Sequence, residues 1–295
     1  MDLKTLTVIT TTYNRDYCLH RVYESLVKQD CKDFVWLVID DGSTDGTEAL
    51  IRGYQEKGLI DIEYYYKPNG GMHTARNVAY DKVHTEINMI IDSDDWIADG
   101  AVRAIIDFWK RNRRDDIAGI ISLDADPKGN IIGTESPAGL KECHYVEYWR
   151  KYRMKGDKKL IYRSDLTRMF PYPEFPGEKF YPASYKFVLL DQHYKMLVLN
   201  HVTCIVDYNN DSMTYAKFAQ YRSSCKGFAH YRNEMIRVST NPVEIIKESI
   251  HYIAESRFAD DRHYIRNSAK PVCTFLCLPM GLVYHAFLCK TKRRY

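Results

Sequence analysis

The sequence lacks several features that would assign it to a familiar class. Its 42 Lys and Arg against 39 Asp and Glu leave a formal net charge of +3, too small an excess to indicate nucleic-acid binding by itself. It contains neither a Gly-x-Gly-x-x-Gly fingerprint nor a Walker A loop, which argues against a dinucleotide-binding or an ATPase reading.

Cysteine pairs and leader sequences are also missing. None of the 8 cysteines forms a Cys-x-x-Cys pair, and Cys273 and Cys277, the closest two, have no histidine partners at zinc spacing. We therefore expect reduced, buried thiols and no zinc site. The first residues lead directly into a strand-like run without a signal-peptide pattern, so the expected location is cytoplasmic.

What the sequence does have is a regular alternation over residues 1–125. Continuous apolar runs, typical of buried strands, occur at 6–10, 34–40, 62–66, 87–92 and 117–122. Amphipathic, helix-like segments separate them, the first over 16–29. This alternation predicts an α/β fold with a mostly parallel sheet flanked by helices.

A polar cluster follows each of the first four runs: TTTYNR, DDGSTD, KPNGG and DSDD. In open sheets of this kind, ligands bind outside the carboxyl ends of the strands. Each cluster alone would be an ordinary turn, but four at one edge predict a ligand site.

The fourth cluster places Asp92 and Asp94 one residue apart, with Asp95 next to them. On an extended segment, alternation would put the first two carboxylates on one side. Such crowded charge needs a cation, and carboxylate oxygens suit Mg²⁺ or Mn²⁺. An exposed turn could carry the same motif, but its place at the end of a buried strand favours the metal.

The second and third clusters suggest contacts to a nucleotide. Asp40 or Asp41 could accept the imide N–H of a uracil-like base, although Ser43 or Thr44 could instead cap the next helix. Gly71 precedes a predicted helix start, with Lys67 and Arg76 as nearby cations. Backbone N–H groups at such a helix end suit a pyrophosphate or a sugar hydroxyl.

Taken in order, TVITTTYNR, VIDDGSTDGT, NGGMHTARNVA and MIIDSDDW resemble the motifs of family 2 glycosyltransferases of the GT-A fold. The later stretch 172–200 resembles the acceptor half of bacterial members that build capsular or lipopolysaccharide chains. The resemblance implies an inverting, metal-dependent transferase that moves a sugar from a nucleotide-diphosphate donor, usually a UDP-sugar. The implied acceptor is a hydroxyl of a glycan or lipid-linked glycan.

The resemblance also implies residue roles. Thr11, Tyr13 and Arg15 would border the nucleoside, and Asp41 or Asp40 would read the base. Asp92 would contact ribose or phosphate, and Asp94 would hold the Mn or Mg ion. The helix-start pair beside the donor is Arg76 and Asn77. Thr11 is a departure, because many members have proline there.

Inverting transfer needs a general base to take the proton of the acceptor hydroxyl. Glu178 matches the acidic position that the family uses for this role, and Asp191 is an alternative. Flanking Phe175 and Phe180 would bury the Glu178 carboxylate and raise its pKa. Otherwise Glu178 is a surface residue paired with Lys179.

We expect a catalytic domain over 1–215, with a nucleotide-sugar half (1–125) and an acceptor half (126–215). A helical region follows over 216–295. Its apolar segment 271–289 precedes a basic end, Lys290 to Arg294. Three arrangements remain open for it: a helix in the membrane interface, a helix packed on the catalytic domain, or a membrane span. The first would place the protein at the inner face of the cell membrane.

Two other functions remain open. A nucleotidyltransferase also uses paired aspartates, although the glycine- and lysine-rich N-terminal loop usual in that class is absent. A nucleotide-sugar-binding module without a catalytic base would have the same donor motifs.

Overall fold

The computed structural model describes residues 4–207 and 217–291. Contacts divide the chain into two compact units: unit 1 is Met1–Pro171 with Leu190–Tyr208, and unit 2 is Tyr172–Leu189 with Asn209–Tyr295. The segment 172–189, expected within the acceptor half, therefore groups with the C-terminal helices. The expected boundary at 215 lies outside the described residues, so the predicted domain division stays a prediction.

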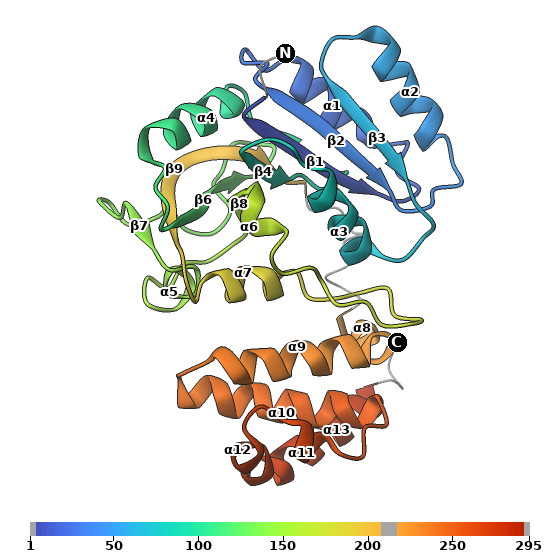
Figure 1. Ribbon diagram of the computed structural model, residues 1–295, viewed down its shortest axis with the longest axis vertical. Helices are drawn as coiled ribbons and strands as arrows, with labels where there is room; N and C mark the ends of the chain where they lie inside the picture. Colours follow the sequence, from blue (N-terminus) through green and yellow to red (C-terminus); the bar gives the residue numbers. More distant parts are fainter. Residues whose placement is uncertain (1–3, 208–216, 292–295) are drawn as a thin grey trace. The chain divides into compact units, whose positions relative to one another are not determined.

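Unit 1 contains a nine-stranded sheet in the order β3-β2-β1-β4-β8-β6-β9-β5, with β7 pairing to β9 (Figure 1). The strands are β1 (Leu6–Thr12), β2 (Phe34–Asp40), β3 (Ile62–Tyr66), β4 (Ile87–Ile90), β5 (Trp96–Ile97), β6 (Ile117–Ala125), β7 (Glu142–Cys143), β8 (Lys158–Arg163) and β9 (Lys195–Ile205). The five expected early strands are all present. Residues 195–205 form the single long strand β9.

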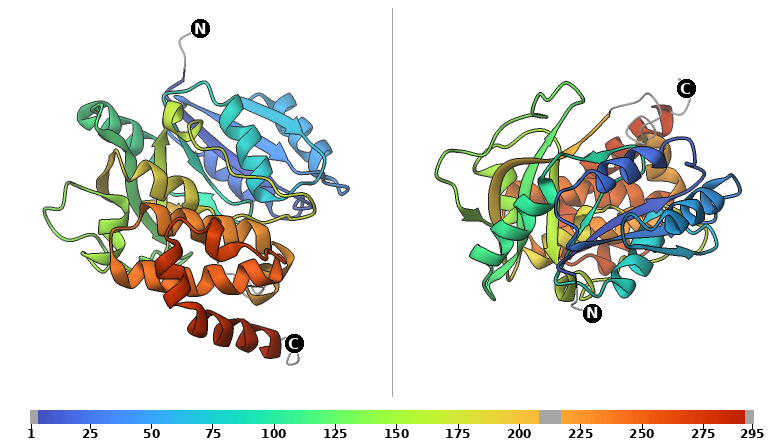
Figure 2. Two further views of the ribbon diagram at one scale, coloured as in Figure 1. Left: turned by 60° about the horizontal axis from the view of Figure 1, so that its bottom comes forward. Right: turned by 90° about the horizontal axis from the view of Figure 1, so that it is seen from above.

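Helices cover both faces of this sheet (Figure 1 and Figure 2). They are α1 (Leu19–Val27), α2 (Thr47–Lys57), α3 (Met72–Lys82), α4 (Ala101–Asn112), α5 (Tyr145–Arg150) and α6 (Ser164–Thr167). Buried side chains of α1, α2 and α4 share one core with Leu6, Val8 and Trp36. Helix α3 instead contacts β1 and β2, and its buried Ala75 lies outside that core. The sheet is thus covered on both faces, as continuous apolar strands require.

The α/β class is confirmed, and the sheet is mixed. Strands β3, β2, β1 and β4 are mutually parallel, as the pattern predicts. Strand β8, which the sequence analysis missed, runs antiparallel between β4 and β6. Its close approach to β6 requires a glycine, because a Cβ on Gly119 would lie 1.9 Å from the backbone oxygen of Ile161.

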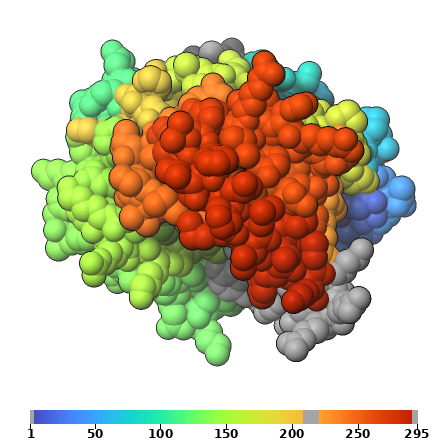
Figure 3. Space-filling view, turned by 90° about the horizontal axis from the view of Figure 1, so that it is seen from below, coloured from blue at the N-terminus to red at the C-terminus, as the bar shows by residue number. Residues whose placement is uncertain are grey.

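Unit 2 is helical, as predicted for the chain beyond 216. Its helices are α7 (Ser184–Leu190, the last residue belonging to unit 1), α8 (Lys217–Ser223), α9 (Cys225–Val238), α10 (Pro242–Phe258), α11 (Tyr264–Asn267), α12 (Pro271–Leu276) and α13 (Leu278–Thr291). Residues 239–241 separate α9 from α10. There Asn241 Oδ1 accepts a hydrogen bond from the Val243 N–H, and Pro242 begins the helix. Figure 3 shows α12 and α13, coloured red, at the front of the view. Over 4–207 and 217–291, no helix is long and apolar enough to cross a membrane.

Candidate active site

The predicted polar clusters meet at the carboxyl ends of β1 and β2. The two strands pair in parallel with Thr12 opposite Asp40, and the Asp41 N–H donates to the Thr12 carbonyl at 2.8 Å. The first two clusters therefore leave the sheet side by side, as expected for neighbouring parallel strands.

Asp41 holds the loop that precedes α3. Its buried carboxylate accepts hydrogen bonds from Lys67 Nζ at 2.5 Å, the Gly70 N–H at 3.0 Å and the Gly71 N–H at 2.7 Å. Asn69 Nδ2 adds a contact of 3.2 Å. Lys67 and Gly71 therefore lie close together, as predicted. Both donate hydrogen bonds to the Asp41 carboxylate.

The glycine after Asp41 is needed for this arrangement. Gly42 has a φ of +88°, and a Cβ there would lie 2.7 Å from the Asn69 backbone nitrogen. Any larger residue would push the loop 67–71 away from β2.

Asp40 also has protein partners. It accepts hydrogen bonds from the Ser43 N–H at 2.7 Å and from the Tyr64 hydroxyl at 2.8 Å. Burial and this carboxylate raise the pKa of Tyr64, so the phenol remains a donor. Tyr64 and Asn69 could not be predicted from the sequence, because both act through contacts to residues distant in the chain.

The loop after β1 is tied to the loop after β2. Asn14, at a φ of +52°, accepts a hydrogen bond from the Thr44 N–H at 2.8 Å and donates its own N–H to Ser43 Oγ at 2.8 Å. Neither Ser43 nor Thr44 caps α2, so that expectation is wrong. Asp45 instead accepts the Thr47 N–H at the helix start.

The residues predicted to border the nucleoside lie on or just after β1. Thr11 is half-buried near the strand end, Tyr13 is exposed and Arg15 is half-buried. Tyr13 is one of two exposed aromatic rings in this loop, the other being Tyr17. Their predicted contacts with a nucleoside stay predictions.

The acidic cluster after β4 is a turn rather than a continued strand. The Asp95 N–H donates to the Asp92 carbonyl at 3.1 Å, so strand alternation does not set the direction of these side chains. The exposed fractions differ accordingly: 56% for the Asp92 side chain, 32% for Asp94 and 7% for Asp95.

Each of the three carboxylates has its own cation. Arg76 NH2 lies 3.6 Å from Asp92 Oδ1, Arg15 NH1 lies 3.8 Å from Asp94 Oδ2, and Lys159 Nζ lies 3.8 Å from Asp95 Oδ2. These cations come from α3, from the loop after β1 and from β8. The three cations thus offset the crowded negative charge of the turn, while the carboxylates of Asp92 and Asp94 remain accessible to solvent.

Arg76 and Asn77 both lie in the first half of α3, whose N-terminal cap is Gly71. Arg76 is buried and Asn77 is half-buried. Helix α3 therefore links the two predicted donor clusters: its start is held by Asp41, and Arg76 faces Asp92.

Beneath the turn lies a buried charged group that the sequence did not predict. Burial, opposed by Lys159, raises the pKa of Asp95 to about 7. Burial also raises the pKa of Asp124, at the end of β6. Burial alone would lower the pKa of Lys159, but its neighbours Cys204, Asp124 and Asp95 outweigh burial and raise that pKa well above its ordinary value.

The two candidate bases both bind a helix start. In unit 2, Glu178 accepts the N–H of Lys226 at 2.9 Å and of Gly227 at 2.7 Å, at the N-terminus of α9. In unit 1, buried Asp191 accepts the N–H of Tyr145 and, at 3.1 Å, of Val146, at the start of α5. Each carboxylate therefore has a structural role. The catalytic role predicted for each of them stays a prediction.

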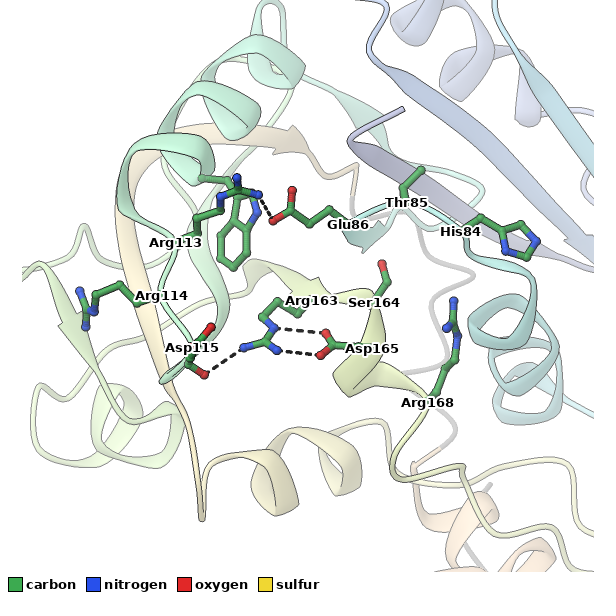
Figure 4. Close-up of a pocket in the computed structure, with 11 residues that line it drawn as sticks. His84, Thr85, Glu86, Arg113, Arg114, Asp115, Arg163, Ser164, Asp165 and Arg168 are labelled. Carbon is green, nitrogen blue, oxygen red and sulfur yellow. Dashed lines mark hydrogen bonds and ion pairs between the residues drawn. The ribbon is translucent and has the colours of Figure 1, made fainter. Parts of the chain in front are cut away.

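A pocket of about 550 Å³ lies at the opposite edge of the sheet, before β4 and after β8 (Figure 4). Arginines line it, but they have protein partners: Arg163 binds Asp165 through two hydrogen bonds of 3.2 and 2.7 Å, and Arg113 pairs with Glu86. The carboxylates neutralise these two arginines, and none of the predicted site residues lines the pocket.

The donor set at the acidic turn fits a hard divalent cation. Over the described residues, no group of three or more His, Cys, Asp or Glu is arranged to hold a metal. An ion bound through one or two carboxylates, substrate phosphates and water needs no such group. Asp92 and Asp94 provide oxygen ligands of the right kind, accessible and close to one another in the chain.

A sheet covered on both faces, with glycine-containing polar loops at the carboxyl ends of its parallel strands, is the architecture of nucleotide-binding α/β proteins. The chain belongs to glycosyl transferase family 2, whose family profile matches residues 7–171. The predicted family is thereby confirmed. Members of this family typically use a divalent cation.

A relative and two solved structures illustrate the likeness. TarP of Staphylococcus aureus (strain N315), a poly(ribitol-phosphate) beta-N-acetylglucosaminyltransferase, is 31% identical over 132 residues, covering 44% of this chain and 40% of that protein. The chain thus spans less than half the length of that relative.

S. aureus TarS 1–349 in complex with UDP-GlcNAc matches with a TM-score of 0.63 at 18% identity, over 98% of this chain and 92% of that one. The mannosyltransferase PcManGT from Pyrobaculum calidifontis, in complex with GDP-Man and Mn²⁺, matches with a TM-score of 0.55 at 16% identity, over 95% and 86%. These likenesses confirm the predicted GT-A fold class.

Proposed function

We propose that this chain is an inverting glycosyltransferase that moves a sugar from a nucleotide-diphosphate donor, most simply a UDP-sugar, to a hydroxyl of a glycan or lipid-linked glycan. The family membership supports the reaction class. One structural observation carries the assignment to this site: Asp92 and Asp94 stay accessible in a turn whose charge is matched by Arg76 and Arg15. Acceptors of this kind would be met at the inner face of the cell membrane.

The donor would lie along the carboxyl ends of β1, β2 and β4. Arg76 and Asn77, with the backbone N–H groups near Gly71, would face the diphosphate, and Asp92 would contact ribose or phosphate. Thr11, Tyr13 and Arg15 would border the nucleoside, with the Asp40–Asp41 loop at the base edge. TarS, solved with UDP-GlcNAc, supports the choice of a UDP-sugar.

Asp94, with Asp92, would hold Mn²⁺ or Mg²⁺. When bound, such an ion supplies positive charge that stabilises a departing diphosphate. The residues of the chain itself contribute in the same sense, because Arg15 and Arg76 present guanidinium groups at the same turn. PcManGT, solved with Mn²⁺, supports the choice of metal.

The acceptor hydroxyl must lose a proton as it attacks, and we assign that proton to Glu178, with Asp191 as the alternative. Glutamine keeps the shape of Glu178 and accepts only one of its two backbone hydrogen bonds, but it cannot take up a proton. Glu178→Gln is therefore expected to bind donor normally and to lose transfer by about two orders of magnitude or more. Exposed Glu174→Gln is the matched control in the same segment.

The first experiment is a thermal-shift panel of UDP-, GDP- and dTDP-sugars, each with and without Mn²⁺. A bound donor raises the melting temperature by mass action, so one nucleotide should give a larger, metal-dependent shift. Asp94→Asn should abolish the metal dependence, whereas exposed Asp99→Asn should not. Equal shifts for all three nucleotides would contradict the assignment.

Product analysis then separates the competing functions. Transfer to an acceptor supports the glycosyltransferase. Release of pyrophosphate would indicate a nucleotidyltransferase. Donor binding with neither transfer nor hydrolysis would indicate a binding module.

A further inference from the structure

Large apolar side chains are exposed on the outward side of α12 and α13, which we name the α12–α13 face. Its members are between 39% and 73% exposed: Val272, Phe275, Leu276, Met280, Leu282, Val283 and Phe287. Scattered exposed apolar residues are ordinary, but a contiguous group on neighbouring helices marks an interaction surface. Figure 3 shows atoms of the two helices, coloured red, at the surface of unit 2.

The inner side of α13 is already packed. A Cβ on Gly281 would lie 2.6 Å from the Ile253 side chain of α10, and Leu288 is buried in a cluster with Ala254 of α10. Helix α13 is thus apolar on the side that meets α10 and on the side that meets water. A helix apolar all round requires a second apolar environment.

The charge of the surrounding chain identifies the environment. After Asp261 the sequence contains no Asp or Glu. Its charged side chains are all cationic: Arg262, Arg266, Lys270, Lys290, Lys292, Arg293 and Arg294, the last three outside the described residues. An apolar segment whose charged neighbours along the chain after Asp261 are all cations is typical of a segment that binds anionic lipid.

A second copy of the chain suits the face less well. A self-complementary contact would bring these cations against the same cations of the other copy, and like charges across an interface cost affinity. Anionic lipid headgroups provide negative charge for the cations, and acyl chains provide an apolar phase for the exposed apolar side chains. A membrane surface therefore suits both features of the α12–α13 face.

We propose that the α12–α13 face binds an anionic membrane leaflet, with α12 and α13 lying in the plane of the interface. At a rise of about 1.5 Å per residue, α13 presents roughly 20 Å of helix. Phe275, Leu276, Val283 and Phe287 enter the boundary between headgroups and acyl chains. The exposed cations Arg262, Arg266 and Lys290 face the phosphates.

The test is flotation of the full chain with phosphatidylcholine vesicles, alone or containing 30 mol% (about a third) phosphatidylglycerol, in low and high salt. Binding should require the anionic lipid and weaken at high salt. The triple variant Leu276→Gln, Val283→Gln, Phe287→Gln should bind on the order of tenfold or more weakly. Leu59→Gln, which changes an exposed leucine of unit 1, should bind like the parent chain.

Circular dichroism and melting temperature of each variant establish that the fold is kept, since the altered side chains are exposed. Absence of vesicle binding by the parent chain would overturn the proposal. So would equal binding of the triple variant. Sedimentation velocity gives the remaining contrary outcome: a parent dimer that the triple variant converts to a monomer, without vesicle binding, would make the face a contact between copies.

Discussion

Lys159 Nζ lies 3.8 Å from Asp95 Oδ2, and both side chains are nearly excluded from solvent. The pair joins β8 to the turn after β4, directly below the two accessible carboxylates. A buried ion pair contributes little net stability, but removing one partner leaves an uncompensated charge. The geometry of the acidic turn therefore depends on a lysine from the strand that the sequence analysis missed.

Lys159→Met should destabilise unit 1 by about 3–5 kcal/mol, because Asp95 and Asp124 would lose their shared buried cation. Urea denaturation followed by fluorescence measures the change. Lys195→Met removes an exposed ion pair with Glu142 and should cost within about 1 kcal/mol. Adding Asp95→Asn to Lys159→Met should recover part of the loss, and equal effects of the two lysine variants would contradict this account.

Asp41→Asn tests the loop that precedes α3. The amide has one acceptor oxygen, so its NH₂ group would face the N–H donor of either Gly70 or Gly71, which bind different oxygens of the carboxylate. The loss of charge-assisted hydrogen bonds should lower the free energy of unfolding by on the order of 3 kcal/mol. If the proposed donor site is correct, UDP affinity measured by calorimetry should fall by about tenfold or more, since roughly 1.4 kcal/mol is a factor of ten.

The control for Asp41 is Asp61→Asn, which alters an exposed aspartate paired with Lys4. It should leave both quantities within error. A stable Asp41→Asn protein with parental UDP affinity would show that the loop 67–71 does not depend on the carboxylate.

The acidic residues of the candidate site show which features of the structure the sequence predicts. Asp40, Asp41, Asp92 and Asp94 could be placed at one sheet edge because parallel strands bring their carboxyl ends together. Strand β8 could not be placed, because its short run, KKLIYR, is paired with β4 and β6 far away in the chain. Lys159 was missed with it.

Glu178 shows the same limit in unit 2. Its type and motif suggested a catalytic base, whereas its partners, the backbone N–H groups of Lys226 and Gly227, lie almost 50 positions further along the chain. A side chain that caps a helix so far away in the chain leaves no local pattern in the sequence. A residue type and a motif can therefore suggest a chemical role from the sequence, whereas a contact to a distant backbone group cannot be predicted in this way.

Arg232 tests the core of unit 2. Its buried guanidinium lies 2.8 Å from Glu248 Oε2 and 3.4 Å from Glu255 Oε2, and these carboxylates outweigh burial and raise the pKa of Arg232. Arg232→Met should cost about 3–5 kcal/mol, because two buried carboxylates would lose their cation. Arg237→Met, on the exposed side of the same helix, should cost within about 1 kcal/mol. Similar losses in chemical denaturation would contradict the assigned role.

His230 should make unit 2 sensitive to acid. Burial lowers the pKa of this imidazole below 6.5, with Glu234 opposing the shift and Arg237 adding to it. The rings of Phe175 and Tyr185 pack against it, and the Tyr181 hydroxyl lies 2.9 Å from Nδ1. The Glu234 carboxylate stabilises the imidazolium less than the loss of water destabilises it, so the net shift of the pKa is downward.

The unfolded chain binds more protons at this histidine than the folded one between the lowered pKa and about 6.5, so stability falls as the pH drops through that window. His230→Asn keeps a polar atom near Nδ1 but does not titrate. Its free energy of unfolding, measured in denaturant from pH 5 to 8, should depend less on pH than that of the parent chain. Because burial also lowers the pKa of His285, some slope should remain. The difference between the two proteins isolates His230, and parallel curves would refute its role.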